Sequence, residues 1–142
     1  MTHRDPNTVQ VGGNHYTKLA HQPDELTLSY DLNGLEHSVV KYFTRWKDKD
    51  GLKDLQKGRH YIEKLLHAEE QVTLNRLMHP RPALRLRVEG YVEKNGLDPR
   101  EAMVVVLICR WRISSEAKHL RTALEAALDL IHDARMSGDW EE

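Results

Sequence analysis

The chain lacks the features that mark secreted and membrane-spanning proteins. Its 142 residues contain one cysteine, Cys109, so no disulfide framework can form, which predicts a protein of a reducing compartment. No apolar run approaches the roughly 18 residues that a membrane span needs, and the polar residues 1–10 resemble neither a signal peptide nor a transit peptide. We therefore expect a soluble protein of the cytoplasm with no membrane partner.

The chain also has no excess of one charge and no metal-binding motif. Lys and Arg total 21 against 22 for Asp and Glu, so no net positive field attracts nucleic acid nonspecifically. The nine histidines form no His-Glu-x-x-His motif, and Cys-x-x-Cys is absent. No serine has an identifiable base, and Cys109 has apolar neighbours, which argues against a nucleophilic enzyme. We expect no dedicated metal site.

Hydrophobic periodicity predicts an all-α fold, because no segment alternates as a strand does. Helices are expected over about 24–30, 33–49, 52–74, 83–94, a segment beginning at 98, and 116–136. These helices predict a bundle of two helix-hairpin units in one domain. The expected parts are an N-terminal arm or loop over residues 1–22, a first hairpin unit over 23–78, and a linker with a second, degenerate hairpin unit over 79–142.

Local signals fix several of these boundaries. Asn33-x-x-Glu36 is a capping pattern that begins a helix, and Asp50-Gly51 interrupts the chain. Pro80 and Pro82 mark a linker, since neither can continue a helix from the residues before it. Asp98-Pro99 supplies a cap and a first-turn proline for the helix that follows. That helix is apolar nearly all round, so it should be the most buried element.

The two hairpins resemble each other in sequence. Residues 39–67 align with residues 104–132 without a gap, and eight of the 29 positions are identical, where chance gives roughly two. The sequence Asn-Gly-Leu precedes both segments. We interpret this as an internal duplication of a two-helix unit.

Polar side chains of the first unit are spaced to share one face. His37, Lys41 and Arg45 follow one another at intervals of four residues, and Asp54, Lys57 and Tyr61 are spaced by three and four. A short antiparallel hairpin would place the two rows side by side. Arginine and lysine suit a phosphorylated ligand, and Asp54 could hold a hydrated magnesium ion or accept a hydroxyl proton.

A solvated helix face would carry similar charges, and the second unit helps to weigh that alternative. There the positions of Lys41, Asp54, Lys57 and Tyr61 hold the less polar or uncharged residues Val106, His119, Thr122 and Ala126. Two explanations are compatible with each other: the first unit kept a site that the second lost, and the second unit is packed at the centre of the protein. Arg45-Trp46 persists as Arg110-Trp111, which favours a structural role with a buried indole.

The chain resembles a bacteriophage family whose characterised member is a small nucleotide kinase without a P-loop. The resemblance covers about residues 11–66 and rests on an ordered series of residues: His15, Tyr16, Lys41, Tyr42, Arg45, Lys49, Gly51, Asp54, Leu55, Lys57 and Tyr61. The chain departs from the family pattern at Glu36-His37, where Gly-Asn is usual, and at Gly58, where alanine is common.

The resemblance implies a phage protein that phosphorylates nucleoside monophosphates with ATP and magnesium in the cytoplasm of an infected bacterium. Lys41, Arg45 and Lys57 would neutralise the transferring group, and Asp54 would bind the metal or orient the acceptor. His15 and Tyr16 would close over the ligand, with His37 and Tyr61 also contacting it. Two alternatives stay open: a noncatalytic binder that sequesters a nucleotide or a nucleotide-derived signal, and a protein that occupies a host factor. We also expect a homo-oligomer.

Overall fold

The computed structural model describes residues 19–138, which form seven α-helices and one short 3-10 helix with no strand among them. The expectation of an all-α bundle is therefore confirmed. His15 and Tyr16, which we expect to close over the ligand, lie outside the described residues. The elements are α1 (Pro23–Tyr30), α2 (Gly34–Arg45), η2 (Trp46–Asp48), α3 (Leu52–His67), α4 (Glu69–Arg76), α5 (Val88–Lys94), α6 (Pro99–Ser114) and α7 (Lys118–Ser137).

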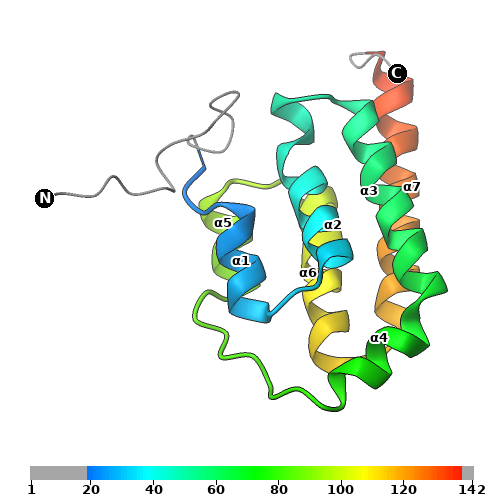
Figure 1. Cartoon of the computed structure of the whole chain (residues 1–142). Coiled ribbons are helices and arrows are strands. Elements are labelled where there is room, and N and C mark those ends of the chain that lie inside the picture. The colour runs from blue at the N-terminus through cyan, green and yellow to red at the C-terminus, as the bar shows by residue number, and fades with distance from the viewer. Residues whose placement is uncertain (1–18, 139–142) are drawn as a thin grey trace, which may run out of the picture.

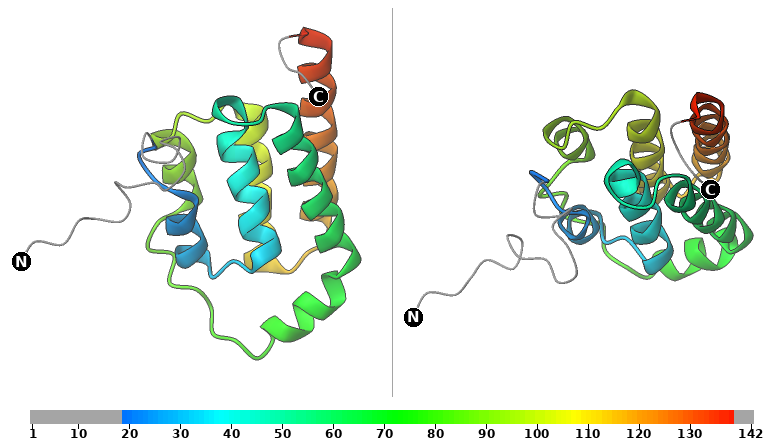
Figure 2. Two further views of the ribbon diagram at one scale, coloured as in Figure 1. Left: turned by 45° about the horizontal axis from the view of Figure 1, so that its top comes forward. Right: turned by 90° about the horizontal axis from the view of Figure 1, so that it is seen from above.

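Four long helices form the body of the protein. Helix α2 packs antiparallel against α3, and α6 packs antiparallel against α7 (Figure 1). The two pairs join through contacts of α3 with α7 and of α2 with α6. The short helices α1 and α5 cover the side of the bundle formed by α2 and α6, and α4 crosses the end opposite the α2–α3 turn (Figure 2).

Two capping boxes begin helices α2 and α6 and reach into the core. The Asn33 side chain accepts from the backbone N–H of Glu36, whose carboxylate accepts in return from the Asn33 N–H, both at 2.8 Å. Asp98 and Glu101 form the same arrangement at the start of α6. Both glutamates are buried. The indole Nε1 of Trp46 donates to Glu101, so the cap of the second hairpin is bound by a side chain of the first.

Helix α6 lies at the centre of the core, as its apolar sequence predicts. Trp111 and Ile108 are fully buried, and Cys109 is 1% exposed. Burial raises the pKa of the Cys109 thiol far above its usual range, so the thiol is inert at neutral pH. The predicted burial of Trp111 is confirmed.

The predicted helix over 52–74 is wrong at Ala68. Helix α3 ends at His67, and the chain changes direction before α4 begins at Glu69. No glycine or proline marks this break. The turn allows Arg76, at the end of α4, to pair with the buried Glu36, a tertiary contact that local sequence cannot reveal.

Two other boundaries also differ from prediction. The helix expected over 33–49 ends at Arg45 and continues as the 3-10 turn η2. The helix expected over 83–94 begins only at Val88, because the preceding segment bonds to α1 instead of to itself. Ser29 donates its hydroxyl to the Leu86 carbonyl at 2.6 Å and accepts the Leu86 N–H at 2.8 Å.

Within residues 19–138, every helix is too short or too polar to traverse a lipid bilayer.

Candidate functional site

The α2–α3 turn fixes how the two polar rows face each other. Gly51 has φ 58° and ψ −126°, a backbone conformation that residues with a Cβ rarely adopt. Its N–H donates to the Trp46 carbonyl at 2.8 Å, which closes the turn directly before α3 begins. The Asp50-Gly51 break predicted from the sequence is therefore confirmed and has a defined geometry.

Asp54 lies beneath this turn and holds Arg45. Its carboxylate is fully buried, and its two oxygens accept from Nε and Nη2 of Arg45, each at 3.2 Å. Oxygen Oδ2 also accepts the backbone N–H of Asp50 at 3.3 Å. Asp54 therefore orients the guanidinium and ties the turn to α3.

Three cations surround the ring of Tyr42. The ammonium of Lys41 lies 4.7 Å from the ring centroid, the guanidinium carbon of Arg45 lies 4.9 Å away, and the ammonium of Lys57 lies 5.7 Å away. Each distance is within the range of a cation–π interaction. We call Lys41, Arg45, Lys57 and Tyr42 the cation cluster.

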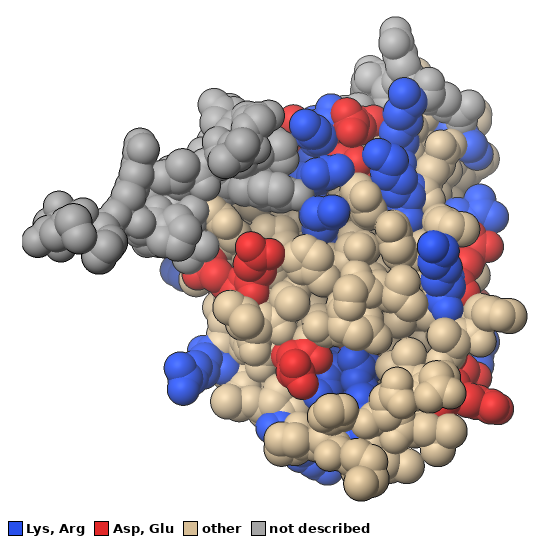
Figure 3. All heavy atoms as spheres, viewed as in Figure 1, with Lys and Arg blue, Asp and Glu red and all other residues tan. Residues whose placement is uncertain are grey.

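A second tyrosine extends this surface along α3. The rings of Tyr42 and Tyr61 are stacked, with centroids 5.9 Å apart and an interplanar angle of 19°. The ammonium of Lys64 lies 5.2 Å from the Tyr61 centroid. Cationic groups thus line a tyrosine pair contributed by two helices. Lys and Arg side chains gather over the ends of α2 and α3 nearest their turn (Figure 3).

The cluster concentrates positive charge. Burial, and then the neighbouring guanidinium of Arg45, lower the pKa of the Lys41 ammonium, and Lys57 acts in the same direction. The nearby Tyr61 and Asp54 oppose this effect without cancelling it. An anion placed among these groups would relieve the repulsion between them.

His37 lies at the edge of the cluster and faces α1. Its Nδ1 is 2.7 Å from the hydroxyl of Thr27, and its Nε2 is 3.8 Å from Asp24. Burial lowers the pKa of His37; Asp24 raises it in part, and Lys41 lowers it further. The ring is therefore positioned by α1, although it remains within electrostatic reach of Lys41.

The structure brings together Lys41, Arg45, Lys57 and Tyr61, four of the residues that the sequence singles out. The corresponding positions of the second hairpin are not at the protein centre: Val106, His119 and Ala126 are half-buried and Thr122 is exposed.

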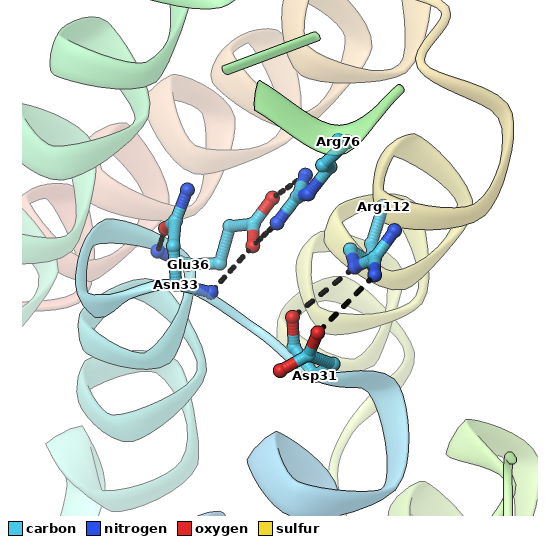
Figure 4. A network of polar contacts seen from close by, with 5 residues as sticks. All are labelled: Asp31, Asn33, Glu36, Arg76 and Arg112. Carbon is cyan, nitrogen blue, oxygen red and sulfur yellow. Dashed lines mark hydrogen bonds and ion pairs between the residues drawn. The ribbon is translucent and has the colours of Figure 1, made fainter. Parts of the chain in front are cut away.

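Tyr42 and Lys64 were not predicted to belong to the site. The signal for Lys64 is its spacing from Lys57 and Tyr61, which places all three on one face of α3. Tyr42 is 9% exposed, and its contacts with cations depend on how α2 meets α3. A polar network around Glu36 and Arg76, at the other end of α2, was also missed (Figure 4).

Comparison of the chain with protein-family models, curated proteins and solved structures gave no significant match.

Proposed function

We propose that this protein binds a nucleotide through its phosphates at the cation cluster. The observation that supports this most directly is the convergence of Lys41, Arg45 and Lys57 on the Tyr42 ring. Lys41 is half-buried among like charges, so a phosphate there would gain charge-assisted hydrogen bonds and remove an unfavourable repulsion. Arg45 is held in one orientation by Asp54 before any ligand arrives, which limits the entropy lost on binding.

The proposed reaction is phosphorylation of a nucleoside monophosphate by ATP. Lys41, Arg45 and Lys57 would stabilise charge on the transferring phosphoryl group, which is the main requirement of such a reaction. Tyr61 and His37 would border the ligand, and His15 with Tyr16 would close over it. This reaction and these roles follow from the resemblance to the phage kinases together with the cluster geometry.

Magnesium enters this proposal only as part of the ATP substrate. The carboxylate of Asp54 is enclosed and accepts from Arg45 and from the Asp50 N–H, so it does not fit the role of a direct metal ligand. In residues 19–138, no three His, Cys, Asp or Glu side chains are grouped so that they could hold a metal ion. Asp54 acts in the proposal by positioning Arg45.

A noncatalytic nucleotide binder is the second candidate, and the same observation on Asp54 favours it. A carboxylate already engaged by a guanidinium is a poor base for an acceptor hydroxyl. Binding without turnover needs only the three cations. A protein that sequesters a nucleotide or a nucleotide-derived signal would use the same surface.

One set of measurements distinguishes the kinase from the noncatalytic binder. The purified chain is incubated with ATP, magnesium and each nucleoside monophosphate, and diphosphates are quantified. Nucleotide affinity is measured in parallel by calorimetry for the wild type, Lys41→Ala and Lys57→Ala, with Lys94→Ala as a control, since Lys94 is exposed on α5. Diphosphate formation supports the kinase. Binding that depends on Lys41 and Lys57 without product supports the binder, and no nucleotide binding at all rejects both.

A further inference from the structure

A second group of charged side chains lies at the opposite end of α2. Arg76, the last residue of α4, and Arg112, in the last turn of α6, both face the loop between α1 and α2 (Figure 4). From Glu36 to Arg45 the helical rise is about 13 Å, so this group is separate from the cation cluster. A surface cavity of about 290 Å³ lies here, and its polar lining consists of Asp31, Asn33, Asn75, Arg76, His79 and Arg112.

Both terminal nitrogens of Arg76 bind the same carboxylate. Its Nη1 donates to Oε2 of Glu36 at 2.6 Å, and its Nη2 donates to Oε1. Glu36 is entirely enclosed, and its Oε1 also accepts the Asn33 N–H. The hydrogen bonds of the Glu36 carboxylate are therefore made to Arg76 and to the Asn33 N–H, and Glu36 acts on Arg112 only through its charge.

Arg112 is enclosed as deeply but has a weaker counter-charge. Its side chain is 7% exposed, and its Nε donates to the backbone carbonyl of Asp31 at 3.1 Å. Its Nη2 is 3.6 Å from the carboxylate of Asp31, which is beyond hydrogen-bond length, and the Asp31 side chain is 72% exposed. Burial, and then the charge of Arg76, lower the pKa of Arg112, and the charges of Glu36 and Asp31 raise it in part.

We infer that this cavity is a second anion site, which takes inorganic phosphate or the phosphoryl group of a small phosphate monoester in place of the Asp31 carboxylate. A guanidinium presents paired donors that match two oxygens of a phosphate. Asn75 accepts from Gln71 at 3.0 Å through Oδ1, which orients the amide NH₂ of Asn75 as a further donor. His79 also lines this cavity.

In this proposal a phosphate replaces the Asp31 carboxylate beside Arg112, so the two anions compete for one position. With Asp31 in place, the two arginines are balanced by two carboxylates, so a phosphate binds only as the Asp31 side chain turns away. Asp31→Asn should therefore tighten phosphate binding, and Arg112→Gln should weaken it. Asparagine suits the Asp31 backbone, which has φ 51°, because asparagine tolerates the left-handed region.

The test uses the full-length chain carrying Lys41→Ala and Lys57→Ala, so that the cation cluster does not contribute. Inorganic phosphate and glycerol 3-phosphate are titrated by calorimetry, and hydrogen exchange of residues 69–79 is followed with and without each probe. We expect saturable binding of at least one probe and slower exchange in α4, which buries none of its own side chains. Asp31→Asn should tighten binding about fivefold and Arg112→Gln should weaken it about tenfold.

Control variants distinguish the loss of the phosphate site from misfolding of the protein. Arg110→Gln, an exposed neighbour on α6, should leave phosphate affinity unchanged. If Arg112→Gln does not fold, Asn75→Ala and His79→Ala replace it, because both residues are exposed, and each should weaken binding about threefold. Absence of phosphate binding in the Lys41→Ala and Lys57→Ala background, or weaker binding in Asp31→Asn, overturns this inference. Neither result affects the proposed function, which fails if the wild-type chain binds no nucleotide or if its nucleotide binding does not depend on Lys41 and Lys57.

Discussion

Arg45 and Asp54 form a two-point ion pair across the α2–α3 turn, with both nitrogen–oxygen distances at 3.2 Å and the carboxylate fully buried. Asp54→Ala should lower the free energy of unfolding by about 3 kcal/mol, because it removes a buried carboxylate that accepts from both Arg45 and the Asp50 N–H. Urea denaturation measures the loss, and nucleotide affinity should fall with it.

A double-mutant cycle with Arg45→Ala isolates the pair itself. If the pair is the cause, the double variant should lose less stability than the sum of the two single variants. Strict additivity, or an Asp54→Ala variant as stable as the wild type, would show that Asp54 does not position Arg45.

Lys41→Met should stabilise the protein near neutral pH. Burial and Arg45 lower the pKa of Lys41 in the fold, so between the folded and the higher unfolded pKa the unfolded chain binds more protons. By linkage, the contribution of Lys41 to stability improves as pH rises through that window and is least favourable below it. The variant should therefore melt above the wild type at pH 7, and the difference should shrink towards pH 10. A wild-type advantage at pH 7 would contradict the repulsion inferred for the cluster.

Gly58→Ala should cost about 1–3 kcal/mol of stability. A Cβ at Gly58 would overlap the ring of Phe43 and lie 2.9 Å from its Cδ2, and that ring is fully buried. Gly34→Ala is the matched control, since a Cβ there meets no atom within 4 Å. Chemical denaturation of both variants, together with Phe43→Leu in the Gly58→Ala background, checks the assignment. The leucine should restore part of the loss.

Trp46 and Trp111, both buried, should respond differently to replacement by phenylalanine. Trp111→Ala should cost about 3–5 kcal/mol, because the indole is fully enclosed. Trp111→Phe should be milder, since Nε1 of Trp111 has no hydrogen-bond partner among the described residues. Trp46→Phe removes the donor to the buried Glu101 and should cost more than Trp111→Phe. Urea denaturation of the three variants orders these costs, and the reverse order for the two phenylalanine variants would refute the role given to the Trp46 bond.

Local sequence signals predicted the parts of the fold that depend on local interactions. The capping residues of α2 and α6 mark helix starts that the structure has at the same positions. The break at Ala68 and the non-helical conformation of residues 83–87 could not be predicted, because their causes are distant partners. Arg76 reaches a residue 40 positions away, and Leu86 bonds to Ser29, 57 positions away.

The same limit applies to the candidate site. Helical spacing predicted that Lys41 and Arg45 share a face, since that relation holds within one helix. Spacing does not determine how far a helix face is buried. It therefore could not show that the Asp54 side chain is buried and pairs with Arg45. Nor could it show that Tyr42 lies between cations of two helices, because that contact depends on the close approach that Gly58 allows at Phe43.

The hydrogen bond from Trp46 to Glu101 links the α2–α3 pair to the α6–α7 pair. Because side chains of one hairpin complete the cap of the other, the halves are complementary surfaces joined by a connecting segment outside the four-helix body (Figure 1). Proteolytic scission between Pro80 and Pro82 should leave two fragments that remain associated, and separately expressed fragments should reconstitute the bundle when mixed.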